Sequence, residues 1–567
     1  MDFMPLPKLA STAVQVAVQD TAFSTDALGR FVANTYEEAT ASGPFSAIVV
    51  GAGAYGAYCA TEIRRSHPGA RVLVLDAGSL LVTEHVQNLG NIGLDVPAPI
   101  MPSADPGTAR EIVWGLPWRG NVEFPGLAYC TGGKSIYWGG WCPRLTDADL
   151  AVWPATVAAW LKANYTTVES ETGVVPDTDF IFGALQTALF PAVTAAAATV
   201  PGLTDVQPAP LAVQGSPPVS GLFGYDKFSS VPLLVDAIRR DVREAHNSDA
   251  ARRLFLVPRA HIVALHTISG RVATVEVDVA GARKFLGIAP GAVVVLAASA
   301  VETTRLALHS FPTPLMGRNL MAHVRTDFPV RIARSALPQL PGPVETAAML
   351  VRGEVATGRF HLQLTASTSR GGSDDLLFKM IPDIEELAAH TTALDPDWIP
   401  VTLRGIGEMT GDRTSPVPDL SRSWIDLSPF ETDEYGVPRA YVHLVTAPGD
   451  IATWAAMDAA ALQLAQTVAG APDRIQYFWD GQWRTQPFPV NRPFPDWHRG
   501  LGTTYHESGT LWMGDDPATS ITDTVGRFHH VSNAYACDQS ILPTVGSANP
   551  VLTGLALTKR VAEALPI

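Results

Sequence analysis

A single histidine, His506, stands in the stretch YHESGTLWMG (505–514), just before a Gly-Thr turn. An imidazole with an ordinary pKa of about 6.5 can take up or release a proton near neutral pH, so His506 could be the base of an active site. Taken alone, however, such a residue is more often a buried histidine whose hydrogen bonds are satisfied within the core. The neighbouring motifs must decide between these two interpretations.

The other histidines give weaker signals for chemistry. His529 and His530 lie in the strand-like run RFHHVSNAY and are predicted to be structural. His498 precedes an Arg-Gly turn, where a structural role is favoured over a place in a pocket. No group of His, Cys and carboxylate residues has metal-ligand spacing, and no G-x-S-x-G motif suggests a serine hydrolase. The sequence therefore predicts neither a metal site nor a serine nucleophile.

A second polar residue of interest is Asn549, which immediately precedes Pro550 and an apolar stretch predicted to be a helix. Asn is a good N-cap and Pro a good first helical residue, so capping alone explains this pair. Alternatively, the start of the helix points toward a cofactor, and its dipole stabilises negative charge that develops there. Asp538 follows a short predicted strand, NAYAC, in the same segment.

The clearest signal for a ligand is a glycine triplet, Gly51, Gly53 and Gly56, in the pattern G-x-G-x-x-G. The first glycine permits a tight turn, the second lets the backbone approach a pyrophosphate, and the third allows a helix to pack closely on a strand. The segment 45–78 around it reads as strand, glycine turn, helix and strand. The helix starts near Ala54, where its free N–H groups and positive dipole end favour phosphate.

An acidic residue, Asp76, ends the second strand of this unit, twenty positions after Gly56. A carboxylate in that place can accept hydrogen bonds from the hydroxyl groups of an adenosine ribose. It favours an unphosphorylated 2′-hydroxyl, and therefore FAD or NAD over NADP. The motif does not distinguish FAD from NAD.

A second glycine cluster, CTGGKSIYWGG (130–140), contains the pairs Gly132–Gly133 and Gly139–Gly140. Such dense glycines let the backbone approach a flat ligand closely. A flexible loop is the alternative. The bulky Tyr137 and Trp138 between the pairs favour a packed, shaped turn, and Ser135 lies between the pairs too.

The composition describes a large chain that can bury an extensive core. Its 567 residues are 47% hydrophobic and 17% charged, which argues against wholesale disorder. The formal net charge of −15 repels phosphate backbones, so nucleic acid is not an expected partner. Four scattered cysteines fit a reducing cytoplasm. The N-terminal residues lack a signal-peptide pattern and no apolar run is long enough to span a membrane, so the expected location is cytoplasmic.

Two regions of different character alternate along the chain. After an arm (1–44) with one predicted helix, STDALGRFVANTYEEATA, short apolar runs predict parallel strands buried on both faces. These runs are Ala47–Val50, Val72–Leu75 and the run GAVVVLAAS (291–299), and PLLVDAIRRDVREAHNSDAARR (232–253) predicts a helix.

From about 330 to 500 the pattern changes to strand-like alternation, as in GRFHLQLTAS (358–367), mixed with proline-rich loops. An aromatic group at 477–497 leads into the segment of His506. Most of these aromatic residues are expected in core and loop packing. Trp479 and Trp483 are the candidates for a pocket role.

In four separated blocks the chain resembles the glucose–methanol–choline (GMC) oxidoreductases, a family of FAD-dependent alcohol-oxidising enzymes. The blocks cover about half of the chain, and residues 331–499 correspond to the family's variable substrate domain. In chain order, the blocks are residues 47–78, the glycine loop at 127–142, VVVLAASAVETTRLALHS together with GRNLMAH (293–323), and residues 502–565.

The resemblance assigns the family's catalytic pair to His506, in HESGT, and to Asn549, just before the last helix. An asparagine at the second position is similar to choline, cholesterol and pyranose oxidases, and ANPVLT is most similar to the pyranose oxidase group. That group attaches FAD covalently through a histidine in GGMSTHW. This chain has GGKSIYW, with Tyr137 at that position, so the resemblance implies a non-covalent FAD.

The resemblance also implies an α/β fold in which a Rossmann-like FAD-binding domain is interleaved with a substrate domain that contains a largely antiparallel sheet. The FAD-binding domain is expected from residues 45–155, 225–330 and 500–567, and the substrate domain from 156–224 and 331–499. The expected cofactor contacts are Gly51, Gly53, Ala54, Gly56, Asp76, Gly132, Gly133, Ser135, Asp538, Asn549, Pro550 and Thr553.

In the implied reaction, a CH–OH group of a sugar, glycoside or other secondary alcohol becomes a carbonyl as a hydride passes to flavin N5. His506 takes the hydroxyl proton, a contribution of about 10²–10⁴-fold for a general base, and Asn549 donates a hydrogen bond to the substrate oxygen. Oxygen, a quinone or a redox protein then accepts the electrons. Three alternatives stay open: a hydroxynitrile lyase of the same fold, an NAD-dependent dehydrogenase, and a non-catalytic flavin-binding protein.

Overall fold

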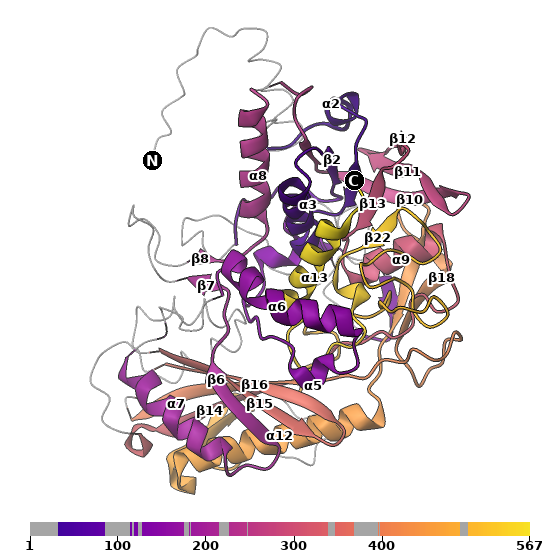
Figure 1. Ribbon diagram of the computed structural model, residues 1–567. Helices are drawn as coiled ribbons and strands as arrows, with labels where there is room; N and C mark the ends of the chain where they lie inside the picture. Colours follow the sequence, from indigo (N-terminus) through magenta and orange to yellow (C-terminus); the bar gives the residue numbers. More distant parts are fainter. Residues whose placement is uncertain are drawn as a thin grey trace.

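The computed structural model describes most of the chain in two regions, one around a parallel sheet and one around a larger antiparallel sheet (Figure 1). The fold is therefore mixed α/β, as predicted. The described residues are 32–85, 114–115, 118–122, 127–174, 181, 183–214, 226–246, 248–337, 346–367, 395, 397–487 and 497–567.

The parallel sheet has five strands that come from distant parts of the chain. Their spatial order is β22-β13-β1-β2-β9, and every neighbouring pair is parallel. All of their residues are buried, which confirms the prediction that these short apolar runs are strands covered on both faces. The strands are β1 (Ala47–Val50), β2 (Val72–Leu75), β9 (Leu254–Val257), β13 (Val293–Leu296) and β22 (Ala534–Ala536).

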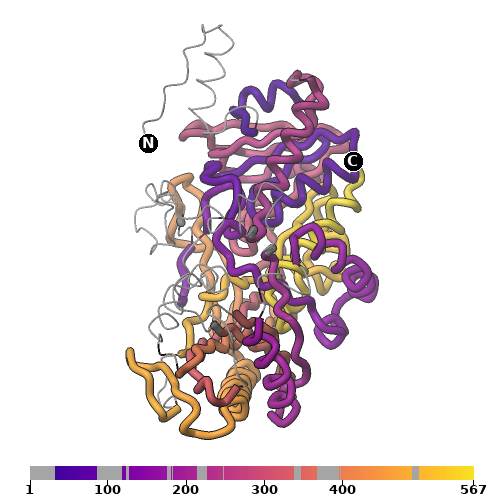
Figure 2. Tube along the Cα trace, turned by 90° about the vertical axis from the view of Figure 1, so that its left-hand side faces the viewer, coloured from indigo at the N-terminus to yellow at the C-terminus, as the bar shows by residue number. Residues whose placement is uncertain are grey.

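Helix α3 (Ala54–Ser66) follows the glycine turn and packs against β1 and β2. Helices α8 (Val231–Glu244) and α13 (Val551–Ala564) pack against α3, and α6 (Ala155–Thr172) packs against α13. Figure 2 shows the C-terminal segment, drawn in yellow, beside the early part of the chain. A buried ion pair between Lys559 Nζ and Glu62 Oε2, 2.7 Å apart, links α13 to α3.

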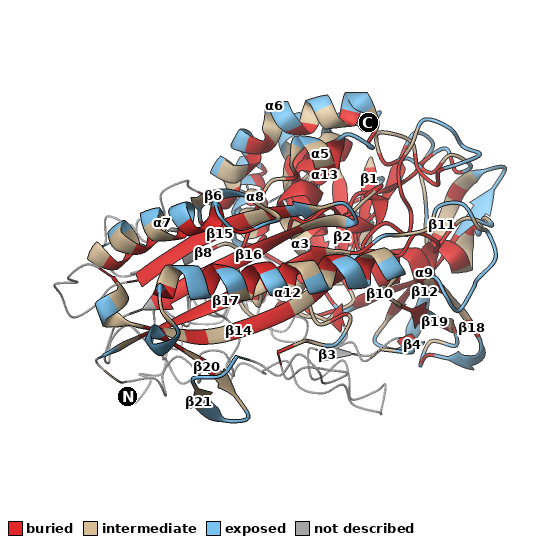
Figure 3. Cartoon of the chain, turned by 90° about the horizontal axis from the view of Figure 1, so that it is seen from below, coloured by how far each residue is buried: buried red, intermediate tan, exposed pale blue. Residues whose placement is uncertain are grey.

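The second region is a seven-stranded antiparallel sheet in the order β21-β20-β14-β17-β16-β15-β6. Helix α12 (Pro448–Ala469) lies across one face and buries its sheet-facing side, as Figure 3 shows, while α7 (Ala184–Ala197) packs on β6 and β15. The strands are β6 (Leu203–Pro208), β14 (His323–Ala333), β15 (Thr346–Val355), β16 (Gly358–Ser367), β17 (Trp398–Glu408), β20 (Ile475–Trp479) and β21 (Gln482–Arg484).

Smaller sheets complete the described structure. One contains β10 (Ala260–Ile268), β11 (Arg271–Val279) and β12 (Ala282–Gly287), another β18 (Trp424–Thr432), β19 (Pro438–His443) and β4 (Trp118–Gly120). The pairs β3 (Trp114–Gly115) with β5 (Leu127–Ala128) and β7 (Val213–Gln214) with β8 (Asp226–Lys227) are short, and α9 (Ala300–Ser310) packs on β10. No helix among the described residues is long and apolar enough to cross a membrane.

Three element boundaries differ from the sequence predictions. In the N-terminal arm, α2 (Tyr36–Ala41) begins only after Thr35, because the Thr35 side chain accepts from Glu38 N and caps the helix there; residues 1–31 lie outside the described part. The helix predicted over 232–253 ends at Glu244. Helix α13 begins at Val551 with Pro550 as its N-cap, one residue later than the prediction that placed the cap at Asn549.

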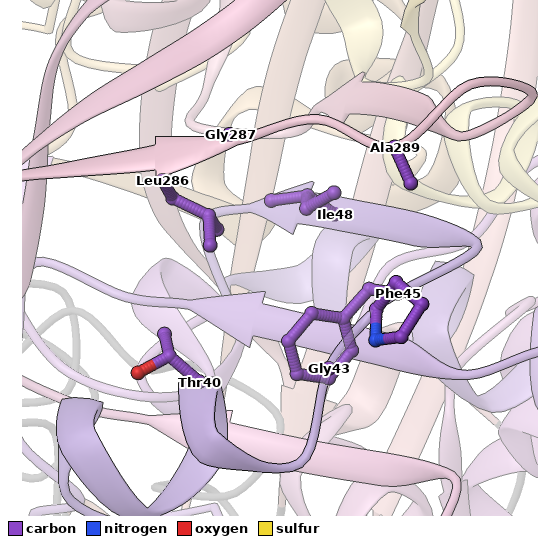
Figure 4. A pocket seen from close by; sticks show the side chains of 8 residues that line it. Thr40, Gly43, Phe45, Ile48, Leu286, Gly287 and Ala289 are labelled. Atoms are coloured by element: carbon purple, nitrogen blue, oxygen red, sulfur yellow. The ribbon is translucent and has the colours of Figure 1, made fainter.

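A small cavity of about 240 Å³ lies between the end of α2, the start of β1 and the end of β12 (Figure 4). Its lining contains no titratable side chain. The residues are Thr40, Gly43, Pro44, Phe45, Ile48, Leu286, Gly287 and Ala289.

The third glycine of the triplet permits the close packing of α3 on the turn after β1. A Cβ added to Gly56 would lie 1.9 Å from the carbonyl oxygen of Gly51 and 3.2 Å from the Cβ of Ala297. The Gly56→Ala substitution is therefore expected to lower the free energy of unfolding by about 1–3 kcal/mol or more, because backbone must move. The measurement is denaturant unfolding followed by circular dichroism.

Gly69→Ala is the matched control, because a Cβ at Gly69, in the turn after α3, would meet nothing within 4 Å. It should change the free energy of unfolding by less than about 0.5 kcal/mol. Equal unfolding curves for the two variants would contradict the packing argument.

Candidate active site

One large cavity, of about 770 Å³, is lined by residues of both the parallel and the seven-stranded sheet. This volume lies within the range of about 300–1,000 Å³ that is common for small-molecule sites. The predicted site residues that line it are Gly51, Gly53, Ala54, Asp76, Gly133, Ser135, His506 and Asn549, and Tyr137 lines it too.

Two glycine turns form one end of the cavity. The N–H of Gly132 donates to the Ala52 carbonyl at 2.6 Å, and a Cβ on Gly133 would lie 3.1 Å from the Cα of Gly53. Side chains here would fill the space between the turns. Helix α3 starts at this point without a side-chain cap on Gly53, so its first N–H groups are left for an anion. The cradle therefore fits a pyrophosphate.

The carboxylate of Asp76 stands beside this cradle at the end of β2. It accepts hydrogen bonds from the N–H of Ala52 at 3.3 Å and from Thr131 Oγ1 at 3.2 Å. Burial raises its pKa to about 6, and these hydrogen bonds act in the opposite direction. A buried acceptor on the cavity wall fits the hydroxyl groups of a ribose.

Five of the predicted cofactor contacts do not line the cavity. Gly56 and Gly132 support it through packing, since a Cβ on Gly132 would lie 2.3 Å from Val231 Cγ2. Asp538 is buried and binds Thr303 Oγ1 at 2.5 Å and Ser540 N at 3.0 Å, which ties α9 to the 3₁₀ helix η5 (Gln539–Ile541). Pro550 caps α13, and Thr553 Oγ1 lies 2.9 Å from the hydroxyl of Tyr165.

The position of His506 is set by a short antiparallel bridge. Met321 N donates to Ser508 O at 3.0 Å, and Ser508 N donates to Met321 O at 2.9 Å. In antiparallel pairing, the residue two before Ser508 lies opposite the residue two after Met321. These residues are His506 and His323, and their rings meet edge to face with centroids 4.9 Å apart.

The glycine of the H-x-x-G motif makes this bridge possible. Gly509 has φ +87°, and a Cβ there would lie 2.7 Å from the carbonyl oxygen of Asn319. Tyr505, just before His506, also has a left-handed φ of +58°, which costs a non-glycine residue about 1–2 kcal/mol. The histidine therefore sits in a tightly constrained loop.

A buried pair of side chains ties this loop to the helix of the phosphate cradle. Gln539 Nε2 donates to the carbonyl of Glu507 at 2.6 Å, and the hydroxyl of Tyr55, on α3, donates to Gln539 Oε1 at 2.7 Å. Because Glu507 adjoins His506, the cradle and the histidine are held in a fixed relation.

Asn549 does not act as a helix cap and instead faces His506. Its Nδ2 lies 3.3 Å from His506 Nε2, and its Oδ1 accepts from Gln363 Nε2 at 3.0 Å. The structure thus brings together the two residues that the resemblance paired.

Two histidines that the sequence reasoning missed complete a buried cluster. His323 Nδ1 lies 2.9 Å from His506 Nδ1, and its Nε2 lies 2.9 Å from the carbonyl oxygen of Gly546. His361 Nδ1 lies 2.6 Å from the carbonyl oxygen of Ser547. A signal for His361 existed in GRFHLQLTAS, where His361 and Gln363 alternate with leucines and must share one face of the strand.

Burial keeps all three imidazoles neutral. It lowers the pKa of His506 well below the usual 6.5, and the nearby His323, His361, Arg325 and Lys134 add to the shift. Burial likewise lowers the pKa of His323 to about 4 and that of His361 to about 3. A neutral His506 can accept a proton near pH 7.

Three arginines surround one carboxylate beside the cavity, and two of them, Arg325 on β14 and Arg404 on β17, belong to the seven-stranded sheet. Asp327 accepts from Arg325 Nη2 at 2.7 Å, from Arg404 Nε at 3.1 Å and from Arg499 Nε at 2.7 Å. Burial alone would raise the pKa of Asp327, but these guanidinium groups hold it well below its usual range. All three arginines line the cavity, and no pattern in the sequence indicated that they would meet.

The loop of the second glycine cluster supplies further groups near His506. Lys134 Nζ lies 3.6 Å from Glu507 Oε2 and 5.2 Å from the centre of the Tyr505 ring. Burial raises the pKa of the Tyr137 phenol above its usual range.

Several other candidates have structural roles. His498 forms a hydrogen bond with Asp458 Oδ2 at 2.5 Å, and its ring stacks on Trp454. His529 forms a hydrogen bond with Ser520 Oγ at 2.8 Å. His530 forms one with the Phe311 carbonyl oxygen at 2.8 Å. Trp479 and Trp483, on the edge hairpin β20–β21, do not line the cavity, so the hypothesis that they form a pocket is not supported. Within the described ranges, no group of three His, Cys, Asp or Glu residues could hold a metal ion.

Two known protein families match segments of this chain, one at the histidine end of the cavity and one at the glycine cradle. Residues 419–558, which include His506 and Asn549, match the family described as GMC oxidoreductase, in its C-terminal part. Residues 49–113, which include the glycine triplet and Asp76, match the family described as an NAD(P)-binding Rossmann-like domain.

Two curated relatives match over short segments. The chain is 45% identical over 60 residues to paromamine 6′-oxidase of Streptomyces fradiae, and 36% identical over 66 residues to 5-(hydroxymethyl)furfural oxidase of Methylovorus sp. (strain MP688). These segments span 11% and 12% of the relatives' own lengths, and the same shares of this chain.

A solved structure shares the whole fold. Pyridoxine 4-oxidase from Mesorbium loti superposes with a TM-score of 0.53 at 16% sequence identity, over 92% of this chain and 98% of that one. The C-terminal family match, the Rossmann-like match and the four sequence blocks agree with this likeness in fold. The C-terminal part of the chain, residues 419–558, is therefore similar to the C-terminal domain of the GMC oxidoreductases.

Proposed function

We propose that this protein is an FAD-dependent enzyme that oxidises a CH–OH group to a carbonyl. The observation that carries the proposal is the pair His506 and Asn549, 3.3 Å apart in the cavity whose other end is the glycine cradle. A neutral buried imidazole is a suitable acceptor for a hydroxyl proton. GMC oxidoreductases generally bind FAD, which supports this cofactor for the cradle.

In this proposal, the chain's own residues bind the alcohol and move one proton. Asn549 Nδ2 donates a hydrogen bond to the hydroxyl oxygen and so orients the alcohol. His506 Nε2 accepts the hydroxyl proton while the carbon–hydrogen bond breaks. When bound, FAD supplies the acceptor for the hydride of that bond.

The cofactor would be held without a covalent bond, by the turns at Gly53 and Gly133 and by Asp76, and Tyr137 cannot form a histidyl link. NAD in the same cradle is the alternative that the Rossmann-like match leaves open. A purified protein with no yellow chromophore would favour NAD.

For the substrate we propose a small molecule with a free hydroxyl group, of the class of sugars, glycosides and other secondary alcohols. The names of the relatives add paromamine and 5-(hydroxymethyl)furfural as compounds to test. Oxygen, a quinone or a redox protein would reoxidise the enzyme. We also propose that residues 45–155, 225–330 and 500–567 form the FAD-binding domain, and that residues 156–224 and 331–499 form the substrate domain.

The first test is an anaerobic visible spectrum of the purified protein before and after adding these alcohols. A yellow flavin band that one compound bleaches is the expected result, because reduction removes that absorption. A flavin band that no compound bleaches would favour a lyase or a non-catalytic flavin-binding protein. No flavin band after incubation with FAD would contradict the proposal.

The His506→Ala variant should slow flavin reduction by about 10²–10⁴-fold, the usual contribution of a general base. Stopped-flow absorbance with a substrate found in the spectral test gives this rate. His266→Ala is the control, since His266 is half-exposed on β10 and binds only Glu276 among the bonds described. Equal rates for the two variants would remove His506 from the reaction.

The pH dependence of the same rate reports the protonation of His506. Because its folded-state pKa lies well below 6.5, the neutral, active imidazole persists as the pH falls, and the rate is lost only when the pH passes below that lowered pKa. The reduction rate should therefore stay flat from about pH 8 to about pH 6.5, where an unperturbed histidine would already have lost about half of its neutral form. A midpoint at or above pH 6.5 would contradict the assignment.

A further inference from the structure

Two backbone carbonyls fix where the hydrogens lie in the histidine cluster. The carbonyl oxygen of Gly546 can only accept, so His323 Nε2, 2.9 Å away, must carry a hydrogen. A neutral imidazole carries one ring hydrogen, so Nδ1 of His323 is bare. It lies 2.9 Å from Nδ1 of His506, which must therefore be the donor. Nε2 of His506 is left bare.

The same reasoning runs from the other end of the cluster. The carbonyl oxygen of Ser547 can only accept, so His361 Nδ1, 2.6 Å away, carries the hydrogen of that ring. His361 Nε2 is bare and accepts from Gln363 Nε2 at 3.1 Å. The second hydrogen of this amide goes to Asn549 Oδ1 at 3.0 Å. The Nδ2 group of Asn549 is then turned toward His506.

The two derivations meet at the 3.3 Å contact between Asn549 Nδ2 and His506 Nε2, where a donor faces a bare nitrogen. The hydrogen positions derived from the Gly546 carbonyl and those derived from the Ser547 carbonyl are therefore compatible at this contact. Burial supports the neutral forms, since it lowers the pKa of His323 to about 4 and that of His361 to about 3.

We propose that His323 is a positioning residue that holds His506 in its Nδ1–H tautomer and so presents the bare Nε2 as the base, while His361, through Gln363, orients the amide of Asn549. This inference rests on the proposed function of His506. The tautomer of a catalytic histidine is set by the hydrogen bond of the ring nitrogen that does not react. In His506 this nitrogen is Nδ1, and its partner is the imidazole of His323.

The arrangement also describes what happens to the proton that His506 accepts. When Nε2 of His506 takes the hydroxyl proton, the ring carries hydrogens on both nitrogens and a positive charge. Its Nδ1–H already donates to His323, and this bond strengthens because its donor becomes charged. No hydrogen has to leave the cluster, and the Nε2–H of His323 continues to donate to Gly546.

The test is ¹⁵N NMR of the FAD-loaded protein with labelled histidine, with His506 assigned from the His506→Ala spectrum. Protonated and bare ring nitrogens resonate well apart, so the tautomer is read directly. We expect His506 to carry its hydrogen at Nδ1 and to show a ¹⁵N–¹⁵N coupling across the bond to His323 Nδ1. A hydrogen at Nε2, or no such coupling, would overturn the proposal without any measurement of activity.

Two variants of His323 separate positioning from mere filling of space. His323→Asn places an amide oxygen near the position of Nδ1 and can still accept from His506. His323→Gln reaches the position of Nε2 and leaves His506 Nδ1 without its acceptor. We expect His323→Asn to keep the tautomer and to reduce flavin within about 10-fold of wild type. His323→Gln should shift the hydrogen to Nε2 and lose about 10²–10⁴-fold, the contribution of a general base.

A purely structural role predicts equal rates and equal tautomers in both variants, and that result would overturn the positioning role. Bound-flavin absorbance and the unfolding midpoint show whether each variant is folded. If His323→Gln does not fold, the ¹⁵N–¹⁵N coupling between His506 and His323 in the wild-type protein still tests the proposed tautomer. If His506→Ala reduces flavin at the wild-type rate while the Nδ1–H tautomer is observed, the proposed function fails and the tautomer assignment stands.

Discussion

A fully buried imidazole needs a hydrogen-bond partner at each nitrogen, because an unsatisfied polar group in the interior costs several kcal/mol (about 2–7). His506 meets this requirement with one partner from each of two distant segments, His323 at the start of β14 and Asn549 just before α13. Both segments must therefore be held still relative to the histidine. The bridge at Met321 and Ser508, the left-handed turn at Gly509 and the start of α13 provide this rigidity.

The cavity combines two structural systems that contribute different groups. The parallel sheet and its glycine turns supply backbone N–H groups and one carboxylate, which suit a dinucleotide. The antiparallel sheet supplies long polar side chains, Gln363, Arg325 and Arg404, from one face of three adjacent strands. The hydrogen bonds from Tyr55 through Gln539 to the loop of His506 join the two systems.

Local sequence patterns predicted the first system well. The strands β1 and β2, helix α3 and the glycine turn follow one another within residues 47–75, and each has a periodicity or a turn residue that marks it. His506 and Asn549 came from the family resemblance, and the structure brings them together. The remaining part of the site depends on register between segments far apart in the chain. Gln363 meets Asn549 across 186 positions, and nothing in the strand around Gln363 indicates which loop will face it.

The position of segments far apart in the chain also explains why some residues predicted to contact the cofactor do not line the cavity. Asp538 follows a strand of the parallel sheet, as Asp76 does, yet its carboxylate accepts hydrogen bonds from Thr303 Oγ1 and Ser540 N inside the protein. A carboxylate at a strand end can serve a ligand or the neighbouring backbone, and the sequence pattern is the same in both cases. Only the position of the neighbouring helix decides between them.

The hydrogen-bond direction in the histidine cluster starts from carbonyl groups of Gly546 and Ser547, which belong to the main chain. Every amino acid carries this carbonyl, so no substitution at either position deletes the acceptor itself. A mutation can disturb the cluster only by moving the loop or by replacing one of the rings or side-chain amides that follow in the chain of hydrogen bonds. The direction of the hydrogen bonds in the site is therefore anchored in the path of the backbone and not in the residue types at positions 546 and 547.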